Sequence, residues 1–152
     1  MKINVQENEK CTEIEVSILC KRRDGKVREI VDFLERNSNR INVKNEKKQT
    51  FLLPYDKIFY IETVDKKVFI YVKDEIYECS YKLYQLEEML PETHFFRISK
   101  SVILNVLNVQ SLEPEEGRRL KVTLENEERL IVSRLYVKDF KLKLGIKQEV
   151  GK

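Results

Sequence analysis

Hydrophobic and polar residues alternate through most of the chain, and this alternation predicts a protein built mainly from short β-strands. Apolar residues fill every second position from Ile14 to Cys20, and Ile41 and Val43 repeat the spacing, which is typical of strands with one buried face. Later segments with strand character are KIFYIET, KVFIYV, IYECS, FFRIS, SVILNV, NVQSL, RRLKVTL and ERLIVS. The sequence therefore predicts at least eight strands, with hairpins at 64–67 and 73–75.

Three helices are predicted between these strands. The first follows Gly25 and carries apolar residues at i, i+3, i+4 and i+7 from Val27, the spacing of a helix with one apolar face. The second is expected to begin after Ser80 as N-cap and to end before Pro91. The third begins at Ser133 and ends at Gly145, and its inward-facing residues are Val137, Phe140 and Leu144.

A polar break at 45–49 divides the chain into two predicted regions. Residues 1–45 form a small strand-helix-strand extension, and residues 46–152 form the strand-rich domain. About 45 residues cannot build a substantial core alone. We therefore expect the extension to pack on the rest of the chain or on a second copy, which makes it a candidate dimerisation element.

Composition places the protein among ordinary single domains. The 152 residues are enough to bury a core without disulfides. The three cysteines, Cys11, Cys20 and Cys79, are odd in number and widely spaced, which favours neither a disulfide framework nor a zinc site. The first residues are polar and the apolar runs are short, so we expect a cytoplasmic protein without membrane insertion.

Charge is distributed unevenly along the chain, although the net charge is only +3. Between Glu92 and Glu113 there is no acidic residue, and from Arg129 to Lys147 six cations accompany one acid, Asp139. Such asymmetry is typical of a protein with one face against phosphate. Two structural explanations remain open: buried strands also lack charge, and lysines near a helix C-terminus suit the helix dipole.

Catalytic chemistry finds little support in the residues. The single histidine, His94, lies between a helix terminator and two phenylalanines, and the adjacent residues Ser99 and Lys100 point to opposite faces of an extended segment. The four glycines are scattered, so no phosphate-cradling loop is present. Acids near the predicted hairpins are ordinary turn formers. We expect neither an enzyme nor a cofactor or metal site.

Cations in predicted turns then become the most informative residues. Lys66 and Lys67 lie at a hairpin tip, Arg97 and Lys100 flank a turn between two strands, and Arg134 starts the third helix. Phosphate contacts supply most DNA affinity, and Arg or Lys at guanine edges supplies discrimination. Loop-presented cations therefore favour a DNA-binding function.

The order of several segments resembles the LytTR family of bacterial DNA-binding domains. The resemblance covers about 51–145 and rests on FLLPYDKIFYIETVDKKVFIYV, LYQLEEML, FFRISKSVILNVLNVQSL and LKVTLENEERLIVSRLYVKDFKLKLG. It implies an elongated, mainly antiparallel β fold with short helices. It also implies a sequence-specific transcriptional regulator that inserts loops into successive major grooves of double-stranded DNA, at imperfect direct repeats.

The resemblance also implies three DNA-contacting loops. The first consists of Asp65, Lys66 and Lys67, the second of Arg97, Ser99, Lys100 and Ser101, and the third of Ser133 and Arg134. Asn105 also matches the family pattern. For Asn105 we favour a buried role in which the side chain bonds loop backbone.

Two residues depart from the family pattern. Many relatives have a histidine where Ser99 stands and a second cation where Leu135 stands. Family members usually carry a receiver domain upstream, and the first 45 residues are too few to hold one. We expect a stand-alone regulator, acting as a homodimer or as two copies on tandem repeats, with an unidentified regulatory protein as a possible partner. The alternative is a protein-interaction module on the same β scaffold with weak or vestigial DNA binding.

Overall fold

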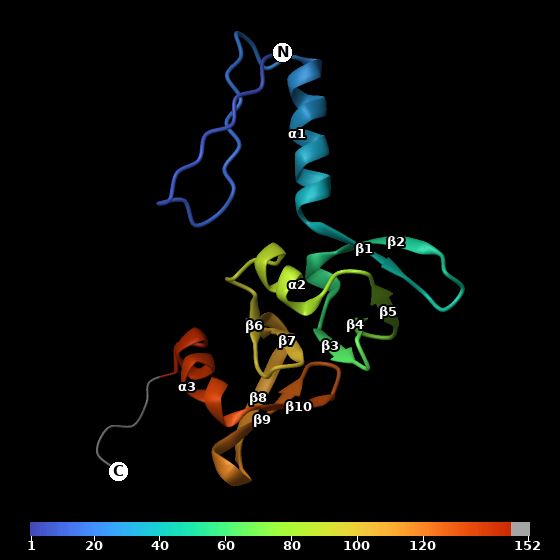
Figure 1. The fold of residues 1–152 in the computed structure, drawn as a ribbon, viewed down its shortest axis with the longest axis vertical. Coiled ribbons are helices and arrows are strands. Elements are labelled where there is room, and N and C mark those ends of the chain that lie inside the picture. Colours follow the sequence, from blue (N-terminus) through green and yellow to red (C-terminus); the bar gives the residue numbers. More distant parts are fainter. Residues whose placement is uncertain (147–152) are drawn as a thin grey trace. The chain divides into compact units, whose positions relative to one another are not determined.

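The computed structural model describes residues 1–146, and for 36–38 the backbone alone (Figure 1). The chain divides into two compact units, 1–38 and 39–152. In the first unit, helix α1 spans Gly25–Ser38, close to the predicted range. Asp24 caps it, because its carboxylate oxygen accepts a hydrogen bond of 3.0 Å from the backbone N–H of Val27.

The strand predicted from Ile14 to Cys20 is absent, and that prediction was wrong. Within the first unit, the described residues before α1 form turns and irregular segments without a strand. Ile14 is 93% exposed and Leu19 is 99% exposed. Alternation alone does not make a strand, because a strand needs a neighbour to take its backbone hydrogen bonds.

The second unit contains a seven-stranded sheet in which each recorded pairing is antiparallel. Its order is β2-β1-β5-β4-β3-β7-β6. The strands are β1 Arg40–Lys44, β2 Thr50–Pro54, β3 Tyr60–Val64, β4 Lys67–Tyr71, β5 Ile76–Cys79, β6 Phe95–Arg97 and β7 Val102–Asn105. The expectation of a mainly antiparallel β fold with short helices is confirmed.

A second, three-stranded sheet follows in the order β10-β9-β8. Its strands are β8 Val109–Glu115, β9 Arg119–Leu124 and β10 Arg129–Val132. Three 3-10 turns connect elements of this unit: η1 Tyr55–Lys57, η2 Val106–Asn108 and η3 Glu116–Arg118. Helices α2 Leu83–Met89 and α3 Arg134–Lys143 complete the fold.

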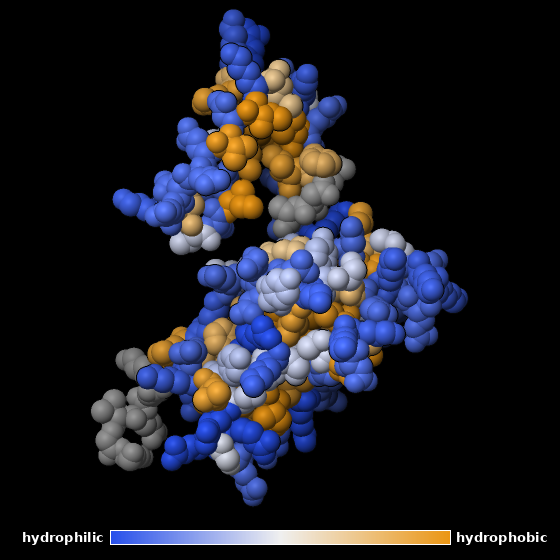
Figure 2. All heavy atoms as spheres, in the orientation of Figure 1, coloured by the Kyte–Doolittle hydropathy of each residue, from blue (hydrophilic) through white to orange (hydrophobic). Residues whose placement is uncertain are grey.

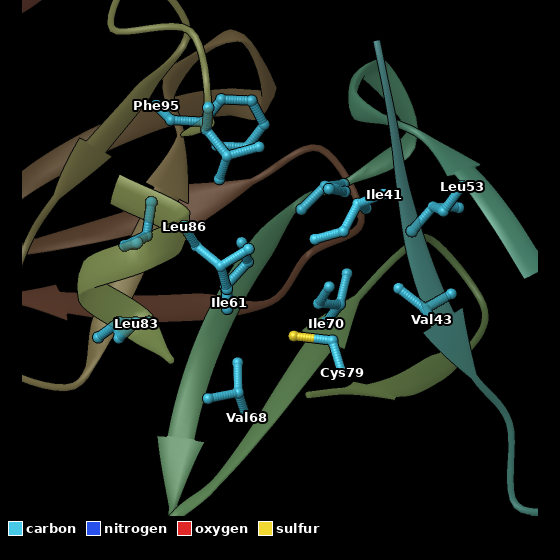
Figure 3. Close-up of a cluster of buried hydrophobic side chains, with 13 residues drawn as sticks. Ile41, Val43, Leu53, Ile61, Val68, Ile70, Cys79, Leu83, Leu86 and Phe95 are labelled. Carbon is cyan, nitrogen blue, oxygen red and sulfur yellow. The ribbon is translucent and has the colours of Figure 1, made fainter. Parts of the chain in front are cut away.

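The core of the larger sheet is mainly aliphatic and includes side chains of α2 (Figure 3). Leu83 and Leu86 of α2 are buried in the same cluster as Ile61 of β3 and Ile70 of β4, and Leu86 lies beside Ile61. The helix does not begin after Ser80 as predicted. It begins at Leu83, because the side chain of Gln85 accepts a 2.9 Å hydrogen bond from the backbone N–H of Lys82, which satisfies a donor of the first turn.

A second core joins the smaller sheet to α3. Phe140 of α3 is fully buried, and Val137 and Leu144 pack against the same cluster, as the helical spacing predicts. Gly145 follows the helix with φ = +74°, a left-handed conformation that suits glycine. The N–H of Ile146 then bonds the carbonyl of Lys141 at 2.9 Å and closes the helix end.

Asn105 lies at the end of β7, and its predicted buried role is confirmed. Only 2% of it is exposed. Its side-chain amide donates a 2.9 Å hydrogen bond to the carbonyl of Ile58, and its side-chain oxygen accepts a 3.1 Å bond from the N–H of Leu107. Asn108 donates a further bond of 3.1 Å to the same Ile58 carbonyl.

The start of the second unit differs from the predicted region boundary. Residues 45–49 form the hairpin turn between β1 and β2, closed by the N–H of Asn45 on the carbonyl of Gln49 at 3.1 Å. The two compact units divide between Ser38 and Asn39 instead. Strand β1 therefore pairs within the sheet and not within an extension. Among the residues that the structure describes, no helix is long and apolar enough to cross a membrane.

Candidate nucleic-acid interface

The first predicted contact loop is a tight two-residue hairpin turn. Val64 of β3 pairs with Lys67 of β4, and the two residues between them, Asp65 and Lys66, have φ values of 50° and 68°. Positive φ at both central positions is the conformation of a type I′ turn. The turn leaves Asp65, Lys66 and Lys67 exposed, so two ammonium groups project from one tip.

The second predicted loop, Ser99–Ser101, connects β6 to β7. The side-chain oxygen of Ser99 accepts a 3.2 Å hydrogen bond from the N–H of Ser101 and lies 3.4 Å from the Ser101 hydroxyl. These contacts make a compact turn in which both serines are half-buried. Lys100, at the apex, is exposed, and so the turn presents one cation to solvent.

The third predicted loop leads from β10 into α3. Ser133 precedes the helix with extended backbone, and its N–H donates a 2.9 Å hydrogen bond to the carbonyl of Ile98. Arg134, the first residue of α3, is exposed. The bond to Ile98 attaches this loop to the segment just before Ser99.

The structure brings these three loops together at one end of the larger sheet. β3 runs towards its turn while the antiparallel β7 runs away from Ser101, so both turns lie at the same sheet end. The N–H of Thr63 donates a 2.9 Å bond to the carbonyl of Ser101, which ties the end of β3, just before the first loop, to the second loop. The Ser133–Ile98 bond ties the third loop to the second.

Arg97 stands apart from the other predicted contact residues. Its side chain is 24% exposed and bonds the protein itself. Nη1 lies 2.8 Å from a carboxylate oxygen of Glu87 in α2, Nε donates a 3.1 Å bond to the carbonyl of Ser99, and Nη2 donates to the carbonyl of Lys100. The exposed cations of the assembled end are therefore Lys66, Lys67, Lys100 and Arg134.

Sequence comparison decides the family. The model of the LytTr DNA-binding domain matches residues 48–145, a range that contains all three loops. The chain belongs to the LytTR family. It is accordingly a DNA-binding domain of the kind found in transcriptional regulators.

Two similar proteins match different lengths of the chain. "Sensory transduction protein LytT" of Enterococcus faecalis is 33% identical over 109 residues, which are 72% of this chain and 45% of that relative. The chain thus spans less than half of that protein. An uncharacterised HTH-type transcriptional regulator of Staphylococcus aureus is 26% identical over 147 residues, 96% of this chain and 99% of the relative.

A solved LytTr DNA-binding domain from Bacillus cereus has the same fold. It superposes with a TM-score of 0.67 at 27% sequence identity, and the match covers 71% of this chain and 98% of the solved domain. The antiparallel β architecture that presents the loops is therefore the LytTR fold.

Burial shifts the pKa of two titratable groups in the larger sheet of this LytTR domain. Burial, followed by a hydrogen bond to Glu128, raises the pKa of Tyr60 far above its usual range. The Tyr60 ring stacks on Tyr71 with centroids 4.2 Å apart. Burial also raises the pKa of the Cys79 thiol, which disfavours the reactive thiolate. Within residues 1–146, no group of three or more His, Cys, Asp or Glu side chains is placed to hold a metal ion.

The sequence did not identify Glu87 as a neighbour of the loops. It lies in the acidic segment around α2, whereas its partner Arg97 ends β6. Only the packing of α2 beside β6 and β7 brings the two side chains together. Lys147, the last cation of the basic C-terminal segment, lies outside the described residues.

Proposed function

We propose that this LytTR domain is a sequence-specific transcriptional regulator that inserts its three loops into successive major grooves of double-stranded DNA. What supports the proposal is the pair of backbone bonds, Thr63 to Ser101 and Ser133 to Ile98, that hold the loops at one sheet end. The three loops carry four exposed cations, Lys66, Lys67, Lys100 and Arg134, which are suited to the phosphates and guanine edges of a duplex. Binding, and not catalysis, is the activity we assign.

Lys100 and Arg134 are proposed as the main discriminating residues. Each is exposed, and each stands on a turn that is held by main-chain or hydroxyl contacts. Ser99 and Ser101 are half-buried and bonded to each other, so we assign them to loop shape and to water-mediated contacts. Asp65 shapes the hairpin turn, while Lys66 and Lys67 neutralise phosphate.

Selection of bound duplexes from a random pool, followed by mobility-shift titration across salt, tests this function. Lys100→Ala and Arg134→Ala are each expected to weaken binding to the selected site by about 1 to 3 kcal/mol and to reduce discrimination. Lys141→Ala, on the third turn of α3, serves as the control and should lower affinity for all sequences alike. If Lys100→Ala leaves binding unchanged at moderate salt, the loop assignment fails.

The same domain is proposed to act as a homodimer or as two copies on imperfect direct repeats, in the cytoplasm. The first unit supports the dimer. Apolar side chains gather on one visible face of that unit (Figure 2), and Ile14 and Leu19 are almost fully exposed. Exposed apolar groups of this size favour a protein partner. If measurements of molar mass in solution show only a monomer, both for the free and for the DNA-bound protein, the dimer proposal is wrong.

A protein-interaction module with weak DNA binding is the second candidate, and Leu135 favours it. This residue is 78% exposed beside Arg134, where an apolar side chain adds nothing to phosphate binding. The two candidates differ in one observable. A DNA reader binds one sequence more tightly than random duplex, over and above an affinity that falls steeply with salt, whereas an interaction module shows no such sequence preference.

A further inference from the structure

The guanidinium of Arg97 contacts three separate groups of the protein. Nε and Nη2 donate to the carbonyls of Ser99 and Lys100, and Nη1 bonds the carboxylate of Glu87 at 2.8 Å. The two carbonyls belong to the turn that presents Lys100. The carboxylate belongs to α2, whose neighbouring residue Leu86 is fully buried. One side chain thus connects a packed helix to an exposed turn.

We propose that Arg97 is a positioning residue, and that Arg97 and Glu87 together form a brace that holds Lys100 in its DNA-binding position. The proposal rests on the function proposed above and assigns Arg97 a different role from direct contact. Glu87 already neutralises the guanidinium, and the side chain is 24% exposed. The guanidinium is therefore poorly placed to bind phosphate, whereas its bonds to the Ser99 and Lys100 carbonyls can fix the shape of the loop.

The brace requires arginine and not simply a positive charge. A planar guanidinium offers five donors in a fixed fork, so it reaches two carbonyls and a carboxylate at once. An ammonium is a point charge on a flexible stem, and it cannot span the same three acceptors. Through this fork, α2 takes part in DNA recognition without touching DNA.

Arg97→Lys separates the brace from a direct phosphate contact. It keeps the charge and removes the fork. The brace predicts that affinity for the selected site falls by about tenfold, approaching the loss in Lys100→Ala. A phosphate contact predicts nearly unchanged affinity, because a lysine also binds phosphate. Near-wild-type binding by Arg97→Lys overturns the proposal.

Glu87→Gln is expected to change DNA affinity in opposite directions, depending on whether Arg97 positions the loop or contacts DNA itself. Glu88→Gln is its matched control. Both variants remove one acid from an exposed position of α2, so general electrostatic effects cancel between them. The brace predicts that Glu87→Gln binds about threefold more weakly than Glu88→Gln, since a charge-assisted hydrogen bond is lost. If Arg97 contacts DNA, its release from Glu87 predicts tighter binding, and that result overturns the brace.

The double variant Arg97→Lys with Lys100→Ala measures the coupling. If Arg97 acts through Lys100, the double variant binds about as weakly as Lys100→Ala alone, whereas independent contacts multiply their losses. Multiplied losses contradict the brace.

Amide exchange in the DNA-free protein tests the brace without any DNA. The N–H groups of Ser101 and Thr63, which bond within and beside the turn, should exchange about threefold to tenfold faster in Arg97→Lys. Unchanged exchange at both overturns the brace. A wild-type protein that selects no DNA sequence instead overturns the proposed function, and the exchange experiment still decides the brace.

Discussion

Replacing Asn105 by aspartate is the sharpest test of the buried hydrogen bonds that this side chain makes to loop backbone. The change preserves shape and keeps the side-chain oxygen that accepts from Leu107. It replaces the amide that donates to Ile58 with a second acceptor, which then faces the Ile58 carbonyl at about the present 2.9 Å. Two acceptors oppose each other without a proton between them, at a position that is 2% exposed.

The magnitude follows from burial. An uncompensated charge in a buried site costs about 3 to 5 kcal/mol, and a domain of this size loses several degrees of melting temperature per kcal/mol. We therefore expect Asn105→Asp to lower the free energy of unfolding at pH 7 by about 3 to 5 kcal/mol. Urea denaturation followed by circular dichroism measures this value.

The pH dependence has a definite sign. Burial raises the pKa of the new carboxyl in the folded state above its unfolded value of about 3.9. Stability is therefore greatest below that unfolded value, where the protonated carboxyl donates to Ile58, and it falls as the pH rises through the folded-state pKa. The deficit relative to wild type should shrink between pH 7 and about pH 4.

Asn108→Asp is the matched control, because Asn108 donates to the same carbonyl at 3.1 Å but is only half-buried. We expect it to cost about 1 kcal/mol, with a weaker pH dependence. Equal losses in the two variants, or a deficit for Asn105→Asp that does not change with pH, would refute the reasoning.

Three further perturbations address the sheets and the loops. Burial and Glu128 raise the pKa of Tyr60 in the folded state, so the unfolded chain loses this proton first, and the free energy of unfolding should fall as the pH rises through about 10. In thermal melts at alkaline pH, the stability of Tyr60→Phe should fall less steeply with pH than that of the wild type. At pH 7 the substitution should cost about 1 kcal/mol. Leu135→Arg should strengthen binding to all DNA sequences and steepen the salt slope by about 0.9, as mobility-shift titrations would show. The double variant Asp65→Asn with Lys66→Gly places residues that tolerate positive φ at the two central positions of the turn. The lower backbone strain should raise the free energy of unfolding by about 1 kcal/mol.

Local sequence signals predicted the elements that depend on local contacts. Helix α1 begins after an aspartate cap, and α3 ends at a glycine with positive φ, because caps and side-chain spacing act within a few residues. Strand β2 was not predicted as a strand. Its segment TFLLP has no alternation and ends in proline, and it is a strand because β1 lies beside it.

Long-range packing explains the predictions that were wrong. Residues 14–20 alternate as well as any strand in the chain, but no strand lies beside them among the described residues. Ser80 is a good N-cap residue by type, yet the helix begins at Leu83, where Gln85 satisfies a backbone donor and Leu83 and Leu86 enter the core. The spacing of apolar residues favours a strand or a helix, but that element forms only where neighbouring elements supply its hydrogen bonds and packing.

For the candidate site too, local sequence signals predicted some features, while others depend on long-range packing. Turn signals placed Lys66 at a hairpin tip and Lys100 beside a turn between two strands, and both side chains are exposed. The sequence could not distinguish Arg97 from Lys100, because both are cations beside a turn. What separates them is the set of acceptors in reach: the guanidinium meets two carbonyls and Glu87, while no acceptor is recorded for the Lys100 side chain among the described residues. In our proposals, a cation that is already bonded shapes the loop, and a cation that is still exposed is available to DNA. Assigning roles to the cations of a LytTR loop therefore requires the positions of carbonyl oxygens, which only the folded backbone supplies.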